Sequence, residues 1–119
     1  MTDEIKNPDP EDYGILLTSC ASKEVKTAII NALLEHRLAA CIQVIAGVES
    51  HYFWKDKITR SDEFLLIIKT LTDYYQQAEE VIRSHHDYEV AEIIFIPLSQ
   101  GNDDYLSWMR QELVKPAES

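Results

Sequence analysis

Two adjacent histidines, His85 and His86, stand in the segment RSHHDYEV, which spans residues 83 to 90. Neutral imidazole is a good ligand for copper, and it also suits zinc and nickel. Two rings would need a third donor beside them to hold such an ion. The candidates for that third donor are Cys20, His51 and Glu89. The segment therefore predicts a site for copper or another divalent metal ion, built on the two histidines.

The same histidines also have a purely structural interpretation. Adjacent residues of a helix point about 100° apart, so His85 and His86 cannot both face inward on one helix. His85 continues an apolar stripe formed by Ala78, Val81 and Ile82, which is typical of a packed histidine near a helix C-terminus. His86 is then either a ligand or a solvent-exposed residue. One ion could take both rings only if the helix ends between them.

Composition and charge narrow the classes of partner. The chain has 119 residues and a formal charge of −10, from 21 acidic and 11 basic residues. An acidic surface tolerates cations but repels nucleic acid and anionic membranes, both of which are bound largely through lysine and arginine. The three glycines, Gly14, Gly47 and Gly101, are too far apart to form a phosphate-binding loop. We therefore expect no nucleic-acid, membrane or organic-cofactor binding.

The chain divides into one domain and two tails. Residues 1–12 are acidic, contain Pro8 and Pro10, and predict a disordered tail. Residues 13–114 are expected to form the domain, and residues 115–119 a C-terminal tail. The start lacks a basic stretch followed by an apolar run, so a cytoplasmic location is expected. Cys20 and Cys41 would then remain reduced, and each could equally serve as a small buried apolar residue.

The coarse pattern predicts an α+β fold. Strands are expected at residues 14–20, 38–54, 58–71 and 92–98, with a polar turn at residues 55–57. Helices are expected to begin at Ser22, Thr72 and Asn102, each of which can serve as an N-cap, and the first should end near Arg37. The order β-α-β-β-α-β plus a terminal helix is typical of a ferredoxin-like sandwich with both main helices on one face of the sheet.

The third strand predicts self-association. In Phe64 to Ile68, alternate side chains point to opposite faces, and both faces are apolar. Two helices can cover only one of them. Leaving the other face in water would forgo about 1.5–3 kcal/mol for each large apolar side chain. If residues 58–71 are all extended, they span roughly 45 Å and project past a small domain. We therefore expect a homo-oligomer.

Four segments in register resemble the CutA divalent-cation-tolerance proteins. They are LAACIQVIAGVESHYFWKDKI at 38–58, LLIIKT at 65–70, SHHDYEVAEII at 84–94 and GNDDYLSWM at 101–109. The resemblance covers residues 14–113. It implies a ferredoxin-like subunit in a tight homotrimer whose subunits continue each other's sheets, with an architecture like that of the trimeric PII signalling proteins. It also implies a link to divalent-metal tolerance and copper binding, and no catalytic reaction.

The sequence departs from the family pattern at three places. Asp87 and Ala91 stand where relatives often carry prolines, so two fixed φ angles are missing from that loop. Some copper-binding relatives have a cysteine near the end of the first strand, where this chain has Thr18. Cys20 follows two residues later on the same strand face, displaced by about 6–7 Å. We take Cys20 as the predicted third metal donor beside His85 and His86.

A second function remains open. A PII-like signalling trimer could bind a small metabolite or a protein partner in the clefts between subunits. The predicted pocket is formed by Trp54, Lys69, Tyr88 and Glu89. Aromatic residues of this kind also serve as core or interface anchors, and Lys69 can instead pair with Glu89 or Glu92. An enzyme with Cys41 as nucleophile is disfavoured, because the run LAAC is typical of packing.

Overall fold

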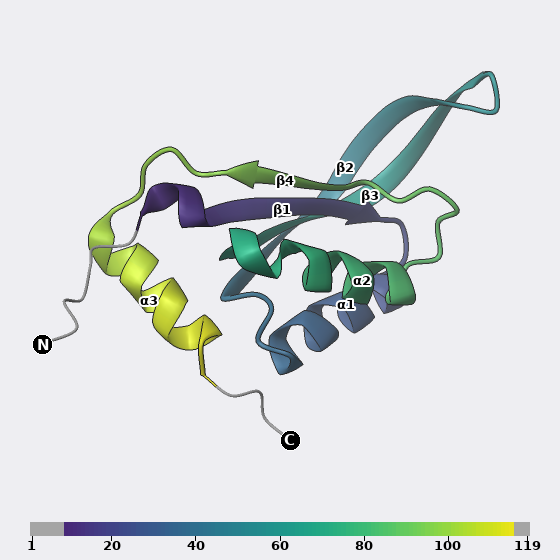
Figure 1. Cartoon of the computed structure of the whole chain (residues 1–119). Coiled ribbons are helices and arrows are strands. Elements are labelled where there is room, and N and C mark those ends of the chain that lie inside the picture. The colour runs from purple at the N-terminus through teal and green to yellow at the C-terminus, as the bar shows by residue number, and fades with distance from the viewer. Residues whose placement is uncertain (1–8, 116–119) are drawn as a thin grey trace, which may run out of the picture.

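The residues assigned to strands and helices form those elements in the predicted order. The computed structural model describes residues 9–115 (Figure 1). The strands are β1 (Tyr13–Cys20), β2 (Cys41–Trp54), β3 (Lys57–Leu71) and β4 (Ile93–Pro97). The helices are α1 (Lys23–Glu35), α2 (Tyr75–His85) and α3 (Asp103–Leu113), with 3-10 turns at Pro10–Asp12 and Thr72–Tyr74. The β-α-β-β-α-β order with a terminal helix is confirmed.

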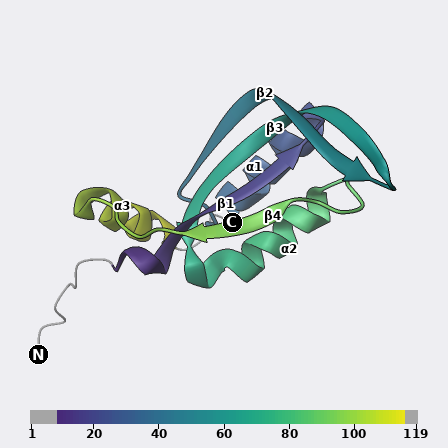
Figure 2. The ribbon, with the colours of Figure 1, turned by 90° about the horizontal axis from the view of Figure 1, so that it is seen from above.

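The four strands form one antiparallel sheet in the order β2-β3-β1-β4. α1 and α2 lie together on one side of this sheet, and α3 lies beyond its end (Figures 1 and 2). The core between the sheet and the two helices contains Leu16, Leu66 and Ile68 from the strands, and Ile29 and Ile82 from the helices, all fully buried. This is the ferredoxin-like α+β arrangement that the sequence predicted.

Part of the predicted N-terminal tail is structured. Residues 1–8 lie outside the described part of the chain, but Pro10–Asp12 form a 3-10 turn in which the Asp9 side chain accepts a hydrogen bond from the Glu11 amide at 3.2 Å. The prediction of a disordered segment through residue 12 is therefore wrong for this turn. At the other end, residues 116–119 of the predicted C-terminal tail lie outside the described residues.

Local hydrogen bonds decide where the helices begin. The amide of Val25 donates to Ser22 Oγ at 3.0 Å and that of Tyr105 to Asn102 Oδ1 at 2.9 Å, so both predicted caps are confirmed. The predicted cap at Thr72 is wrong. Its hydroxyl donates instead to the Glu11 carbonyl at 2.8 Å, and α2 begins only at Tyr75, after a 3-10 turn.

The hairpin of β2 and β3 extends well beyond the rest of the sheet (Figure 1). β1 ends where Cys20 pairs with Phe64, so residues 57–63 of β3 are paired with β2 alone. We call the two-stranded part, residues 48–63, the arm. Its turn is tighter than predicted, with only Lys55 and Asp56 between the strands, both at positive φ (51° and 65°). A two-residue turn of this hand matches the twist of a hairpin.

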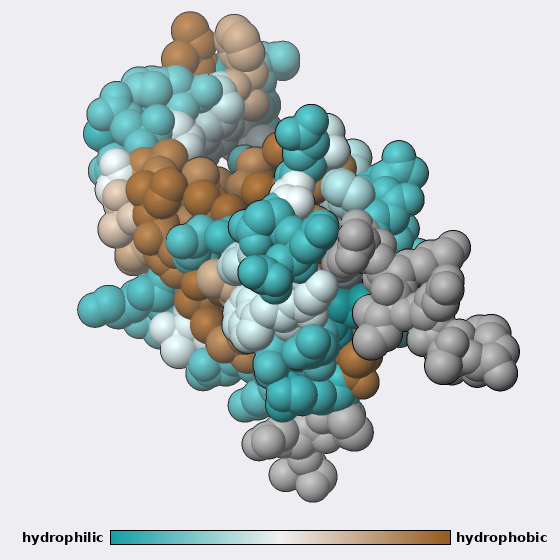
Figure 3. All heavy atoms as spheres, turned by 90° about the vertical axis from the view of Figure 1, so that its left-hand side faces the viewer, coloured by the Kyte–Doolittle hydropathy of each residue, from teal (hydrophilic) through white to brown (hydrophobic). Residues whose placement is uncertain are grey.

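The face of the sheet opposite α1 and α2 is apolar and uncovered, as the alternation in β3 predicted. We call it the open face. Ile45, Ile94 and Ile96 on this face are 48%, 49% and 48% exposed. Hydrophobic side chains form a continuous area below the hairpin when the molecule is viewed from the α3 end (Figure 3). A patch of this kind typically marks an interaction site.

α3 closes the end of the sheet through a second, smaller core. Leu106, Met109 and Leu113 are buried against Tyr13 and Leu71, the first residue of β1 and the last of β3. α3 therefore packs on the edge of the fold and leaves most of the open face uncovered.

Even the longest of the described helices, α1 with 13 residues, lacks the length and apolarity required to cross a membrane.

The Thr18→Val variant should stabilise the fold. Thr18 is fully buried on the helix side of β1, and its hydroxyl finds no hydrogen-bond partner among residues 9–115. Removing a buried donor that lacks a partner should raise the free energy of unfolding by about 1 kcal/mol. Chemical denaturation of both proteins would measure the difference. A lower midpoint for the variant would show that the hydroxyl has a partner.

Candidate functional site

The two adjacent histidines point to different environments. α2 ends at His85, and His86 adopts an extended conformation with φ −84° and ψ 147°. The helix does end between them, which is the condition for both rings to reach one ion. However, His85 is exposed to solvent, whereas the His86 side chain is only 1% exposed. The prediction of a packed His85 is therefore wrong. The backbone changes direction after residue 85, and the ring that turns inward is that of His86.

Hydrogen bonds fix the tautomer of His86. Its Nε2–H donates to the Ser19 carbonyl at 2.7 Å, and its Nδ1 accepts from the Tyr88 amide at 3.1 Å. Both ring nitrogens of the neutral form are thus engaged with the backbone. To bind a metal ion, His86 would have to give up one of these two bonds. Each is a partly buried contact whose loss leaves a backbone group without this partner.

His85 keeps one ring nitrogen free for a ligand. Its Nδ1–H donates to the Val81 carbonyl at 2.9 Å, a bond within the last turn of α2. The Val81 carbonyl can only accept, so the proton lies on Nδ1, which is also 3.1 Å from Ser84 Oγ, and Nε2 has no hydrogen-bond partner among residues 9–115. A neutral imidazole with a free Nε2 is the usual form of a histidine metal ligand.

Cys20, the predicted third donor, is fully buried on the helix side of β1. Burial raises the pKa of its thiol, and the nearby Asp87 and Glu63 carboxylates raise it further. The thiolate, which is the metal-binding form, is therefore disfavoured. Within the described chain, no three histidine, cysteine, aspartate or glutamate side chains lie close enough together to hold a metal ion.

The predicted ligand-pocket residues are spread over the molecule. The Lys69 ammonium lies 5.4 Å from the centre of the Tyr105 ring of α3, and Trp54 lies at the tip of the arm with the Lys55 ammonium 5.7 Å from its ring. Tyr88 contacts Glu63 at the root of the arm, the point where the two-stranded hairpin joins the rest of the sheet, and Glu89 is exposed. A single copy of the chain therefore does not assemble this pocket.

The predicted ion pair of Lys69 with Glu89 or Glu92 is wrong: among the described residues, Lys69 contacts no carboxylate within ion-pair distance. Lys69 pairs with Ile15 of β1, whereas Ile93, the residue after Glu92, pairs with Thr18. Three residues along a strand correspond to roughly 10 Å. The register of the sheet thus separates the ammonium from both carboxylates.

Glu63, which no motif in the sequence singled out, is the centre of a buried polar cluster. Glu63 is 6% exposed. Its Oε1 accepts a hydrogen bond from Ser50 Oγ at 2.6 Å, and its Oε2 accepts from the Tyr88 hydroxyl, also at 2.6 Å. Burial and the Glu63 carboxylate raise the pKa of Tyr88, so its hydroxyl stays protonated and donates. A signal was present, because Glu63 shares a strand face with Leu65 and Ile67.

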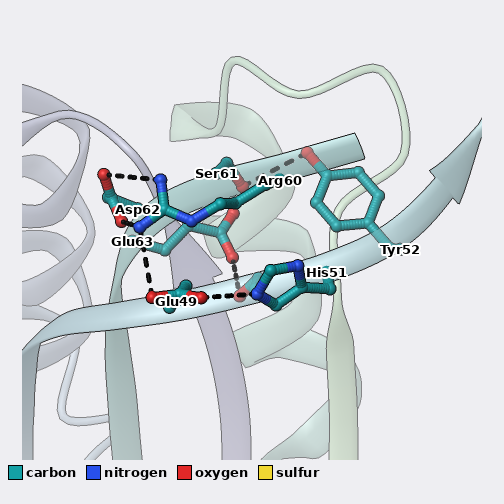
Figure 4. Close-up of polar contacts among 8 residues, drawn as sticks. Glu49, His51, Tyr52, Arg60, Ser61, Asp62 and Glu63 are labelled. Carbon is teal, nitrogen blue, oxygen red and sulfur yellow. Dashed lines mark hydrogen bonds and ion pairs between the residues drawn. The ribbon is translucent and has the colours of Figure 1, made fainter. Parts of the chain in front are cut away.

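A second polar group lies at the root of the arm and is open to solvent (Figure 4). Glu49 accepts hydrogen bonds from His51 Nε2 at 2.6 Å and from Arg60 at 3.2 Å, and Arg60 also pairs with Asp62 at 2.9 Å. The bond from Arg60, followed by that from His51, lowers the pKa of Glu49. His51, a candidate third donor, is thus already engaged with a carboxylate of its own strand.

The two cysteines should differ in reactivity. At pH 8, iodoacetamide should modify the half-buried Cys41 well before Cys20, because the raised pKa of Cys20 and its burial both suppress its thiolate. Peptide mass spectrometry over a time course would compare the two rates, with the chain unfolded in guanidinium as the control in which the rates converge. Equal rates in the native protein would contradict the buried, protonated state of Cys20.

Comparison with known proteins identifies relatives over nearly the whole domain. The family described as CutA1 divalent ion tolerance protein matches residues 14–112. The divalent-cation tolerance protein CutA of Thermus thermophilus is 37% identical over 97 residues, which are 82% of this chain and 94% of that protein. The human protein CutA is 40% identical over 102 residues, which are 86% of this chain and 57% of the human protein.

Solved structures agree with the sequence relatives. The Thermus thermophilus divalent cation tolerance protein superposes with a TM-score of 0.81 at 36% identity, over 84% of this chain and 97% of that one. CutA from Xylella fastidiosa superposes with a TM-score of 0.82 at 30% identity, over 86% and 98% of the two chains. Fold, sequence identity and coverage all lead to the same assignment: the chain belongs to the CutA1 divalent ion tolerance family.

Proposed function

We propose that this chain is a cytoplasmic divalent-cation tolerance protein that acts as a homotrimer and binds copper or a similar divalent ion. The observation that carries the proposal is the match of residues 14–112 to a family named for divalent ion tolerance. Its relatives are named for tolerance rather than for a reaction, which supports a binding role over a catalytic one. Two unpaired cysteines are compatible with a reducing compartment.

Self-association is supported by the open face and by β2. The isoleucines of the open face are about half exposed, and burying each would contribute about 1.5–3 kcal/mol. β2 is an edge strand of 14 residues, so one side of its backbone has no partner strand within the described chain. Long exposed edges favour pairing with another chain. Assembly of three copies would cover both features.

Metal binding is best supported at His85. His85 is exposed, its Nε2 has no hydrogen-bond partner within the described part of the chain, and the net charge of −10 favours the approach of cations. The other two predicted donors are held back in the single chain, His86 by its two backbone bonds and Cys20 by its raised pKa. Because the described part of one chain contains no three-donor cluster, we propose that the site is completed by donors from a second copy.

The PII-like alternative receives less support, because the matching family and its relatives are named for divalent-cation tolerance. A metabolite pocket formed by Trp54, Lys69, Tyr88 and Glu89 would have to be assembled from different subunits, because these residues are dispersed in one chain. We therefore keep divalent-cation binding as the proposed function.

Loss of the free imidazole should weaken copper binding. Replacing His85 by alanine should raise the Kd for Cu²⁺ by about ten-fold or more, because one coordinating nitrogen is lost. Isothermal titration of the purified protein with Cu²⁺ would measure this. The matched control is His36→Ala, which removes another exposed histidine outside the predicted site. The proposal fails if the unmodified protein shows no saturable uptake, or if both variants bind equally well.

A charge on the open face should dissociate the oligomer. Ile94→Glu places a carboxylate on an uncovered apolar face and should shift the protein toward monomers at micromolar concentration. Leu34→Glu is the matched control, because Leu34 is 45% exposed but belongs to α1, on the other side of the sheet. Sedimentation velocity would compare the two variants with the parent. A parent that sediments as a stable monomer would refute the homotrimer.

A further inference from the structure

The root of the arm combines two features that permit bending. β1 ends at Cys20, opposite Phe64, so residues 57–63 of β3 pair with β2 alone and the arm has only two strands. The register of β2 against β3 also shifts between Ile45 and Val48, and Gly47 within this bulge has a φ of 73°. A bulge bends a strand pair, and an isolated two-stranded ribbon is only marginally stable. Within a single subunit, the angle of the arm is therefore set by contacts at this bend.

Glu63 lies at this bend and joins the arm to the body of the domain. Val48 and Glu63 form the first strand pair beyond the bulge. One carboxylate oxygen of Glu63 accepts a hydrogen bond from Ser50, on the arm, and the other accepts one from Tyr88, in the segment between α2 and β4. Both distances are 2.6 Å, as expected for strong hydrogen bonds from hydroxyl groups to a carboxylate.

Tyr88 is itself held firmly on the body side. Its amide donates to His86 Nδ1 at 3.1 Å, and the two rings stack at an angle with their centres 4.8 Å apart. His86 Nε2 then donates to the Ser19 carbonyl, next to the last residue of β1. A continuous series of hydrogen bonds thus runs from Ser50 through Glu63, Tyr88 and His86 to the end of β1.

We propose that the Glu63 carboxylate locks the arm at its bend and couples the angle of the arm to the conformation of residues 86–92. A force on the arm would act on this segment through Tyr88. In return, displacement of Tyr88 would release the arm. The coupling is a property of the polar cluster and does not depend on copper or on any other ion.

Two single substitutions on opposite sides of the carboxylate test the coupling. Tyr88→Phe removes the body-side bond to Glu63, and Ser50→Ala removes the arm-side bond to the same carboxylate. Hydrogen–deuterium exchange with mass spectrometry would follow peptides from the arm and from residues 86–92 in the full chain. We expect about ten-fold faster exchange in both segments for each variant, because a hydrogen bond to a charged group is lost in each case.

The decisive observation is whether each substitution also changes exchange in the segment on the other side of Glu63. If Tyr88→Phe accelerates only residues 86–92 and Ser50→Ala only the arm, or if neither segment changes, the proposed coupling is wrong. Asp62→Asn is the matched control, because it changes the adjacent carboxylate, whose side chain is 67% exposed. Exchange in α1 should stay constant, which would exclude general destabilisation. Sedimentation of each variant would ensure that the same oligomeric state is compared. Because exchange is measured without added metal, a failed copper titration would not affect the result.

Discussion

The difference in length between β1 and β3 is the constraint on which the rest of the structure depends. β1 pairs with Phe64–Leu71, and the remaining seven residues of β3, Lys57–Glu63, have β2 as their only strand partner in the described chain. Within the paired region, β3 is central and is covered by α1 and α2 on one face only. Beyond that region, it becomes one strand of the arm. The open face, the projecting arm and the buried cluster at its root all follow from this arrangement.

Hydrogen bonds explain why a buried carboxylate is tolerated at the root of the arm. An ionised group removed from water is costly unless it is hydrogen-bonded, and Glu63 has a hydroxyl donor at each oxygen. The end of β1 leaves room for a side chain from elsewhere in the chain, and Tyr88 provides the second of these donors. The polar cluster is thus specific to the point at which β1 stops.

Much of this fold could be predicted because it depends on local patterns. The alternation of Leu65, Leu66, Ile67 and Ile68 reports two apolar faces, and both are observed. The site could not be predicted to the same degree. One residue at the end of α2 decides which of His85 and His86 is buried, and helix ends are the least certain part of a periodic pattern. Glu63 matters through Tyr88, which is 25 residues away in sequence. No local pattern reports such a contact.

The tip of the arm has a consequence for how the protein behaves at high concentration. Phe53 and Ile58 form a cross-strand pair there and are 77% and 79% exposed, close to the free edge of β2. Such a surface favours nonspecific association with other chains. The net charge of −10 opposes indiscriminate contact at long range, but it acts over only about 8 Å at physiological ionic strength. Colloidal stability of newly made subunits therefore depends on the salt around them, and correct assembly competes with precipitation.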